Sequence, residues 1–185
     1  MHTVRIFALA LAALVFISAA LPANASRFNQ LDGNPGLRSE SAMVVGEDGS
    51  VIYGKDENTV RPIASITKLM TAMVIVDSGI SLDEKITVTK EDRDLVQLTG
   101  SRLEYGATLS REQMIMLAVM SSENRAATAL GRTYPGGMTA FVEAMNVKAR
   151  MLGMSNSRFA DPAGLHVKNQ STASDLAKMV NAAYG

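Results

Sequence analysis

The spacing of apolar residues predicts an apolar N-terminal segment followed by a small hairpin. Residues 6–20 are apolar except for Ser18. Two short apolar stretches, residues 43–45 and 51–53, flank a polar turn that contains Asp48-Gly49. An Asp-Gly pair between two apolar stretches is typical of a β-hairpin. We therefore expect the folded part of the chain to begin with two paired strands.

Most of the remaining chain has the apolar spacing of helices. Residues 65–76 are apolar nearly all round, which predicts a helix buried in the middle of the fold. Ser110 and Gln113 form a capping-box pattern in front of a helix over residues 114–120. Apolar spacing also predicts helices over residues 124–130, over residues 138–152 and from Thr172 onward, and a short strand over residues 86–88. Together these elements indicate a domain of the α/β class.

The N-terminal segment has the features of an export signal. A basic residue precedes the apolar run, and Ala23-Asn24-Ala25 matches the small-residue pattern of a cleavage site. A membrane anchor is the alternative, but the run is short for a membrane span and is followed by Pro22. We therefore expect cleavage after Ala25 and a periplasmic product. The expected divisions are residues 1–25 as signal peptide, 26–37 as flexible leader and 38–185 as the folded domain.

Composition excludes several classes of function. The chain has no Cys and two His, and only His166 would remain after cleavage, so we expect no metal site. Basic and acidic residues are balanced, at 18 each, which argues against nucleic acid as a partner because such partners need a basic face. A Ser-His-Asp triad would depend on His166. That residue follows Pro162-Ala163-Gly164, a stretch typical of a loop, so the triad is disfavoured.

Ser65 and Lys68 have the spacing of a nucleophile and its base. Residues three apart on a helix share a face, so the Lys68 amine can reach the Ser65 hydroxyl and accept its proton. Apolar surroundings and the positive end of the helix dipole both favour the neutral amine. The backbone N–H of Ser65 could also help to stabilise an oxyanion. The alternative is that Ser65 caps the helix and Lys68 extends to solvent.

Ser122-Glu123-Asn124 supplies a second group of polar side chains. In the catalytic interpretation, the Ser122 hydroxyl relays a proton between Lys68 and the leaving amine. The Asn124 amide then orients either the substrate backbone or Lys68. We expect Glu123 to point away from the site and assign it no role. The alternative is that Ser122 only caps the helix that starts near Asn124.

These motifs resemble those of the low-molecular-mass penicillin-binding proteins of the D-Ala-D-Ala peptidase family. Residues 63–72 resemble the family's nucleophile helix, and residues 117–127 resemble its second motif, in the form found in the endopeptidase branch. Residues 141–153 and 171–176 resemble later helices of the family. The resemblance covers residues 38–185. It implies an α/β fold of the penicillin-binding protein/β-lactamase-like transpeptidase type.

The resemblance also implies a function. Family members are serine-type D-Ala-D-Ala endopeptidases or carboxypeptidases that need no cofactor. Their partners are peptidoglycan peptides and β-lactams. By resemblance, Ser65 would form the acyl ester, Lys68 would accept its proton, Ser122 would assist and Asn124 would bind substrate.

The family's third motif, Lys-Thr-Gly, is not found. Leu98-Thr99-Gly100 lacks the lysine and precedes the second motif, so we do not accept it as a substitute. We therefore expect the C-terminal strands of the fold to be missing and the 185-residue form to be unstable and nearly inactive. Two alternatives stay open: an inert remnant or muropeptide-binding protein, and a β-lactamase, which shares the Ser-x-x-Lys motif.

Overall fold

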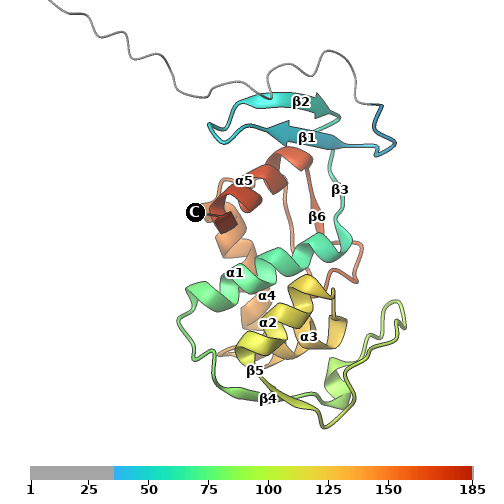
Figure 1. Cartoon of the computed structure of the whole chain (residues 1–185), viewed down its shortest axis with the longest axis vertical. Helices are drawn as coiled ribbons and strands as arrows, with labels where there is room; N and C mark the ends of the chain where they lie inside the picture. Colours follow the sequence, from blue (N-terminus) through green and yellow to red (C-terminus); the bar gives the residue numbers. More distant parts are fainter. Residues whose placement is uncertain (1–35, 185) are drawn as a thin grey trace, which may run out of the picture.

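The computed structural model of the protein describes residues 36–184. The predicted signal peptide, the cleavage site after Ala25 and nearly all of the leader over residues 26–37 lie outside the described residues. Figure 1 shows an elongated molecule with a hairpin at one end, helices in the middle and a second small sheet at the other end. Within the described part, no helix is both long enough and apolar enough to cross a membrane.

The helices and strands lie close to the predicted ranges. The helices are α1 (Thr67–Asp77), α2 (Arg111–Met120), α3 (Asn124–Arg132), α4 (Gly137–Met151) and α5 (Ala173–Tyr184), with 3-10 turns η1 (Ala64–Ile66) and η2 (Lys90–Asp92). The strands are β1 (Ala42–Val45), β2 (Val51–Lys55), β3 (Arg61–Pro62), β4 (Lys85–Thr87), β5 (Thr108–Ser110) and β6 (Gln170–Ser171).

The predicted hairpin is confirmed. Strands β1 and β2 pair antiparallel, with Val44 opposite Tyr53. The turn between the two strands depends on Asp48 and Gly49. Gly49 has a φ of +79°, a conformation that glycine adopts at no steric cost, and the Asp48 carboxylate accepts hydrogen bonds from the backbone N–H and the hydroxyl of Ser50.

Two further pairs of strands join segments that are distant in the sequence. Strand β4 pairs antiparallel with β5, and β3 pairs antiparallel with β6. The β3–β6 pair brings the segment just before Ser65 beside the segment just before α5. The pairing continues past β3, because the Ile63 N–H donates to the Asn169 carbonyl. This places the loop between α4 and α5 beside the start of α1.

Helix α1 lies at the centre of the core, as predicted. Its apolar side chains Met70, Met73, Val74 and Ile75 are buried, and it contacts α2, α3, α4 and α5. The α-helix itself starts two residues later than predicted. Ser65 lies in the 3-10 turn η1, because Ala64 has a φ of +44° and the chain enters the helix through a tight turn.

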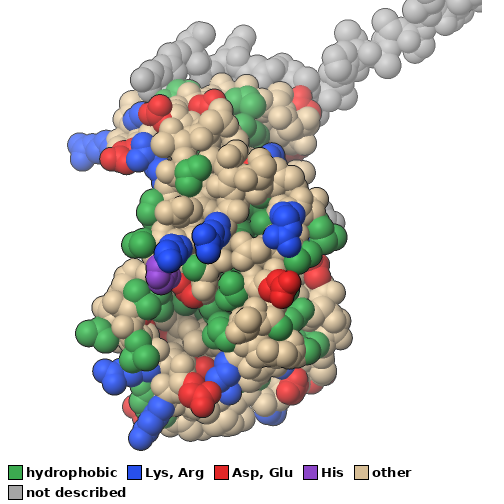
Figure 2. All heavy atoms as spheres, turned by 180° about the vertical axis from the view of Figure 1, so that it is seen from behind, with side chains coloured by type: hydrophobic (Ala, Val, Ile, Leu, Met, Phe, Trp, Pro, Cys, Tyr) green, Lys and Arg blue, Asp and Glu red, His purple; other side chains and the backbone are tan. Residues whose placement is uncertain are grey.

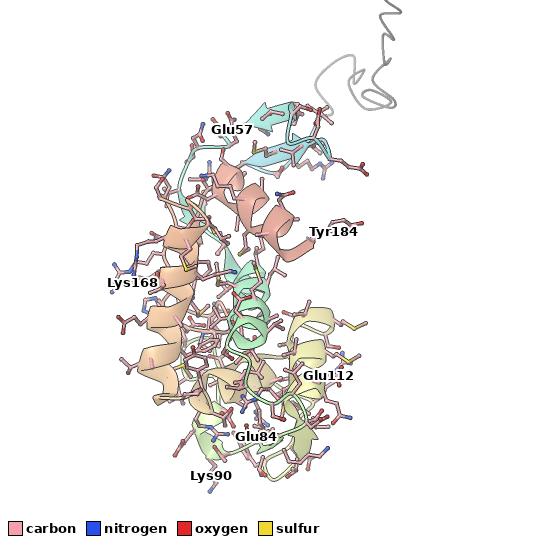
Figure 3. The ribbon with its side chains drawn as sticks, turned by 90° about the vertical axis from the view of Figure 1, so that its left-hand side faces the viewer. Glu57, Glu84, Lys90, Glu112, Lys168 and Tyr184 are labelled. Carbon is pink, nitrogen blue, oxygen red and sulfur yellow. The ribbon has the colours of Figure 1, made fainter. Side chains whose placement is uncertain are left out.

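Helix α2 begins with the predicted capping box. The Ser110 hydroxyl accepts from the Gln113 N–H at 3.2 Å, and the Ser110 N–H donates to the Gln113 side chain at 2.9 Å. The next residue, Arg111, is 1% exposed and pairs with the Glu84 carboxylate at 2.6 Å. Glu84 lies at the end of the molecule opposite the hairpin (Figure 3), so this pair joins α2 to the small β4–β5 sheet.

Candidate active site

The nucleophile candidate Ser65 is exposed and lies in η1 at the entrance to α1. The backbone in front of it is held by a close approach from another loop. A Cβ atom added to Gly164 would lie 1.9 Å from the Ala64 carbonyl oxygen, so only glycine fits at position 164. Gly164 also has a φ of +79°. The turn that presents Ser65 is therefore fixed by direct backbone contact with the loop around Gly164.

Lys68 lies between three oxygen atoms from three parts of the chain. Its Nζ is 3.0 Å from Ser65 Oγ, 3.3 Å from Ser122 Oγ and 2.7 Å from the Ala163 carbonyl oxygen. Only 2% of Lys68 is exposed, so the amine does not extend to solvent. The alternative interpretation of this residue is therefore wrong. The structure brings Ser65, Lys68 and Ser122 together.

Burial lowers the pKa of the Lys68 amine from its ordinary value of 10.5, because desolvation disfavours the ammonium form. The carboxylates of Asp161 and Glu123 partly oppose this effect, since their negative charge favours the ammonium. The net direction is downward. A lowered pKa increases the fraction of neutral amine near neutral pH, and only the neutral amine can accept a proton from Ser65.

The hydroxyl groups have a definite arrangement around that amine. The Ser122 hydroxyl lies 2.9 Å from Ser65 Oγ and is placed to donate to it. The Ala163 carbonyl can only accept, so one N–H of Lys68 is always directed to it. A neutral amine keeps one further N–H for Ser122 and a lone pair for the Ser65 hydroxyl. This arrangement can take a proton from Ser65 and pass one to Ser122.

Asp161 shapes the loop that places the Ala163 carbonyl. Its Oδ1 accepts from the backbone N–H groups of Ala163, Gly164 and Leu165, at 2.7, 2.6 and 3.2 Å. Its Oδ2 accepts from the His166 N–H at 2.8 Å. The loop is tied to α1 as well, because the Thr71 hydroxyl donates to the Pro162 carbonyl. Sequence reasoning gave Asp161 no role.

The expectation that Glu123 has no role is wrong. Its Oε1 accepts from the Arg125 N–H at 3.1 Å, which makes Glu123 the N-cap of α3. The alternative that Ser122 caps this helix is therefore also wrong. Ser122 instead has a φ of +54°, an uncommon conformation for a residue other than glycine, which turns it out of the helix. Glu123 also accepts from the Ser101 hydroxyl at 2.7 Å.

Asn124 is bonded to a loop that sequence reasoning set aside. Its side-chain N–H₂ donates to the Thr99 hydroxyl oxygen at 2.9 Å. Thr99 belongs to the Leu98-Thr99-Gly100 string, which we did not accept as a third motif. Among the described residues, the structure records no bond from Asn124 to Lys68, so its role as an orienting group for the lysine has no support.

The arrangement around Ser65 matches a known family. The family model for D-alanyl-D-alanine carboxypeptidases, peptidase family S11, matches residues 29–184. The chain belongs to this family. The match includes Ser65, Lys68, Ser122 and Asn124, and the resemblance that the motifs predicted is thereby confirmed.

Individual members of the family are also similar to this chain. The D-alanyl-D-alanine endopeptidase of Escherichia coli (strain K12) is 50% identical over 147 residues, which are 79% of this chain and 47% of that protein. The D-alanyl-D-alanine endopeptidase of Pseudomonas aeruginosa is 48% identical over 145 residues, which are 78% of this chain and 47% of that protein. The chain thus spans about half the length of these curated S11 relatives.

Solved structures support the predicted fold. An S216A mutant of the Streptomyces K15 DD-transpeptidase has a TM-score of 0.76 and 29% identity, covering 82% of this chain and 63% of that one. Penicillin-binding protein D2 of Listeria monocytogenes, in a cefotaxime-bound form, has a TM-score of 0.71 and 28% identity, covering 82% of this chain and 64% of that one. This chain therefore has the predicted penicillin-binding-protein fold over its described residues.

His166 is engaged within its own loop. Its Nδ1 accepts from the Lys168 N–H at 3.0 Å. Figure 2 shows basic side chains grouped across the middle of the face that it draws. The geometry gives no support to a triad built on His166. Within residues 36–184, no group of three His, Asp or Glu side chains is placed to hold a metal ion.

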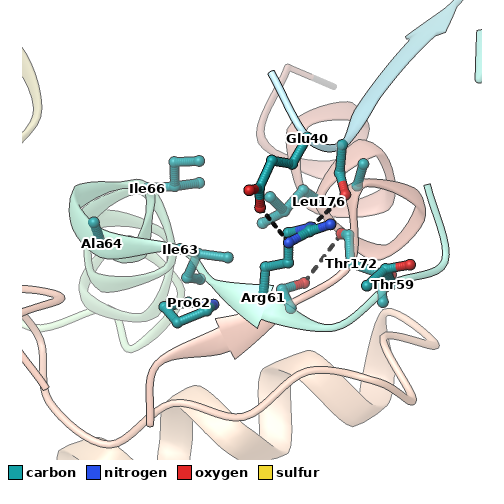
Figure 4. A pocket seen from close by; sticks show the side chains of 12 residues that line it. Glu40, Thr59, Arg61, Pro62, Ile63, Ala64, Ile66, Thr172 and Leu176 are labelled. Atoms are coloured by element: carbon teal, nitrogen blue, oxygen red, sulfur yellow. Dashed lines mark hydrogen bonds and ion pairs between the residues drawn. The ribbon is translucent and has the colours of Figure 1, made fainter. Parts of the chain in front are cut away.

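A pocket adjoins the turn that holds Ser65. It lies between η1, β3 and the start of α5, and Ala64, Ile66 and Thr172 contribute to its lining. Figure 4 shows Arg61 directed toward Glu40 in this pocket. The two side chains form an ion pair, and Arg61 also donates to the Ser41 hydroxyl at 2.8 Å. The guanidinium charge is therefore already compensated.

Proposed function

We propose that the protein is a serine-type D-Ala-D-Ala peptidase that cleaves peptidoglycan peptides through an acyl ester on Ser65 and is acylated by β-lactams. The observation that supports this most directly is the position of the buried Lys68 amine, 3.0 Å from Ser65 Oγ and 3.3 Å from Ser122 Oγ. A base held this close to a serine hydroxyl generates the nucleophile. The family to which the chain belongs gives the substrate class.

In the acylation step, neutral Lys68 accepts the Ser65 proton as Ser65 Oγ attacks the carbonyl carbon of the D-Ala-D-Ala bond. The oxygen of that carbonyl becomes an oxyanion, and the Ser65 backbone N–H is a candidate donor to it. When the intermediate collapses, the C–N bond breaks. The leaving amine receives a proton from the Ser122 hydroxyl, which regains one from the Lys68 ammonium.

In the second half of the cycle, a water molecule attacks the acyl ester from the position that the leaving amine has vacated. Lys68 accepts a proton from this water. The ester bond to Ser65 breaks, and the serine oxygen recovers its proton through the same groups. Thus no cofactor is needed for the proposed reaction. The similarity to endopeptidases at 50% and 48% identity favours cross-linked peptides over linear pentapeptides as substrates. We also propose that the signal peptide is cleaved after Ala25 and that the mature protein acts in the periplasm. This location agrees with peptidoglycan peptides as the substrate class.

The test uses the longest form of the protein that its gene encodes. After incubation with benzylpenicillin, intact-mass analysis should show one covalent adduct, and peptide mapping should place it on Ser65. Ser65→Ala should give no adduct, whereas Ser39→Ala, an exposed serine outside the site, should be labelled as fully as the unmodified protein. Purified cross-linked muropeptides should then be cleaved at the D-Ala bond. An adduct that persists in Ser65→Ala, or binding of muropeptides without cleavage, would contradict the proposal.

A further inference from the structure

We propose that Thr99, held by Asp94, is a positioning residue that fixes the side-chain amide of Asn124 in one orientation and thereby sets how the site recognises an amide group beside the acylated carbonyl. This inference rests on the proposed acylation of Ser65. It assigns a role to the Leu98-Thr99-Gly100 string, which neither the motifs nor the proton transfers above explain.

The direction of each hydrogen bond follows from chemistry. Asp94 Oδ2 lies 2.6 Å from the Thr99 hydroxyl oxygen. Burial raises the pKa of Asp94, but hydrogen bonds from Thr99, Gln97 and Val96 together outweigh burial and lower the pKa to about 2, so the carboxylate is ionised near neutral pH and can only accept. The Thr99 hydroxyl must therefore donate its single proton to Asp94.

The oxygen of Thr99 is then left as an acceptor, and this determines which way Asn124 faces. Its partner at 2.9 Å must be the N–H₂ of Asn124 and cannot be the side-chain carbonyl. One N–H of the Asn124 amide is thereby directed to Thr99, which fixes the directions of its second N–H and of Oδ1 within the amide plane. Among residues 36–184, neither that second N–H nor Oδ1 has a hydrogen-bond partner. The second N–H is available to donate to the carbonyl oxygen of an amide group in a bound peptide or β-lactam.

Backbone hydrogen bonds to Asp94 hold the loop so that the Thr99 hydroxyl lies beside the Asp94 carboxylate. Asp94 Oδ1 accepts from the N–H groups of Val96 and Gln97 at 2.8 and 2.9 Å, and its Oδ2 accepts from the Thr99 N–H at 2.9 Å. Leu98 has a φ of +56°, which is sterically unfavourable for a residue with a Cβ atom. Its side chain is 69% exposed, so burial of Leu98 does not offset that cost. Hydrogen bonds to Asp94 on either side of Leu98 hold the loop in this conformation.

The same loop also contacts the segment that holds Lys68. The Gln97 side-chain N–H₂ donates to the Leu165 carbonyl at 2.9 Å, two residues beyond the Ala163 carbonyl that binds the Lys68 amine. The loop thus joins the α3 N-terminus, where Ser122 and Asn124 lie, to the segment around Ala163. Thr99 is therefore placed between the two sides of the site, and its fixed hydrogen bond orients a side chain that faces substrate.

The test compares two β-lactams in the unmodified protein and in Thr99→Val, which has nearly the same shape but cannot accept a hydrogen bond. Benzylpenicillin has an acylamino group beside its β-lactam ring, and 6-aminopenicillanic acid lacks it. In Thr99→Val, the second-order rate constant for acylation by benzylpenicillin should fall about tenfold, the effect of one hydrogen bond. The constant for 6-aminopenicillanic acid should stay within about twofold.

Two control variants separate positioning from folding. Thr99→Ser keeps the hydroxyl and should restore the rate with benzylpenicillin. Thr87→Val removes an exposed hydroxyl that bonds to Thr108 in the β4–β5 sheet and should change neither rate. Equal slowing with both compounds would show that Thr99 only maintains the fold and would overturn the inference. Unchanged rates with both would overturn it as well.

A second measurement keeps the inference testable if the unmodified protein is not acylated at all, an outcome that would contradict the proposed function. The side-chain ¹⁵N–¹H signals of Asn124 should shift, and their hydrogen exchange should become faster, in both Thr99→Val and Asp94→Asn. In Thr87→Val they should stay unchanged. Asn124 signals that do not respond to the loss of the Thr99 hydroxyl would overturn the inference without reference to catalysis.

Discussion

The hydroxyl oxygens of Ser65 and Ser122 lie 2.9 Å apart, although 57 residues separate them in the sequence. The Lys68 amine contacts both. In the proposed mechanism, this one amine exchanges protons with both hydroxyl groups. Each of the two serines depends on the position and the protonation state of Lys68, which makes that residue the most informative site for mutation.

Replacement of Lys68 by arginine should abolish acylation. A guanidinium stays protonated at any pH at which the protein is folded and cannot accept the Ser65 proton. The loss of a general base costs about 10²–10⁴-fold in rate. The measurement is the rate of covalent labelling by benzylpenicillin. Far-UV circular dichroism and a thermal melt should show that the variant is folded, and near-normal labelling in a folded Lys68→Arg variant would mean that another group is the base.

The pH dependence of acylation should respond to Glu123. The rate should rise with pH through the lowered pKa of Lys68, because only the neutral amine is a base. The Glu123 carboxylate raises the pKa of Lys68. Glu123→Gln removes this charge but keeps an oxygen that can cap α3, so the pKa of Lys68 should fall further and the inflection of the pH–rate profile should move to lower pH. An inflection that moves upward would contradict the assigned electrostatics.

Replacement of Gly164 by alanine should destabilise the protein and impair acylation together. The new Cβ would meet the Ala64 carbonyl oxygen, which cannot move without displacing Ser65. We expect a loss of about 2–4 kcal/mol in the free energy of unfolding, measured with urea. Gly153→Ala is the matched control. Gly153 also has a positive φ, but nothing lies within 4 Å of its added Cβ, so it should lose only about 1 kcal/mol and keep its acylation rate.

The buried ion pair between Asp92 and Arg132 should contribute to stability. Asp92 is fully buried, and its carboxylate accepts from Arg132 at 2.8 and 3.0 Å. Asp92→Ala should lower the free energy of unfolding by about 3 kcal/mol, because the guanidinium is left half-buried without its partner. Asp77→Ala removes a more exposed pair with Lys148 and should cost less than about 1 kcal/mol. Equal losses in the two variants would show that burial of the pair is unimportant.

Sequence reasoning predicted the elements that have a strong local signal. The Asp48-Gly49 turn, the Ser110–Gln113 capping box and the apolar helix after Ser65 each determine their own structure over a few residues. The contact between Lys68 and Ser65 followed for the same reason, since Ser65 lies in the turn η1 that leads directly into α1, where Lys68 lies. The approach of Ser122 could not be derived from spacing alone, and it was expected from the catalytic interpretation of Ser122 and from the family resemblance.

Other parts of the site depend on contacts between segments that show no local pattern. Strand β5 has three residues and depends on its pairing with β4. The roles of Asp161 and Thr99 depend on how loops fold back on themselves, and the sequence gives only weak indications of this. One such signal was present, because Asp161-Pro162-Ala163-Gly164 has the residues of a tight turn. The cap formed by Glu123 was missed because Ser122 is the more usual residue type for that position.

The three oxygens around the Lys68 amine have a consequence for folding. Two of them belong to residues that are 54 and 95 positions away in the sequence, so the amine is enclosed only after long loops have closed. Contacts of such separation form late, because their entropy cost must be met before they stabilise the chain. A partly folded chain would thus hold Lys68 in water, fully charged and unable to activate Ser65. Covalent labelling by a β-lactam would then report completion of tertiary structure, and its appearance during refolding would time the last step of assembly.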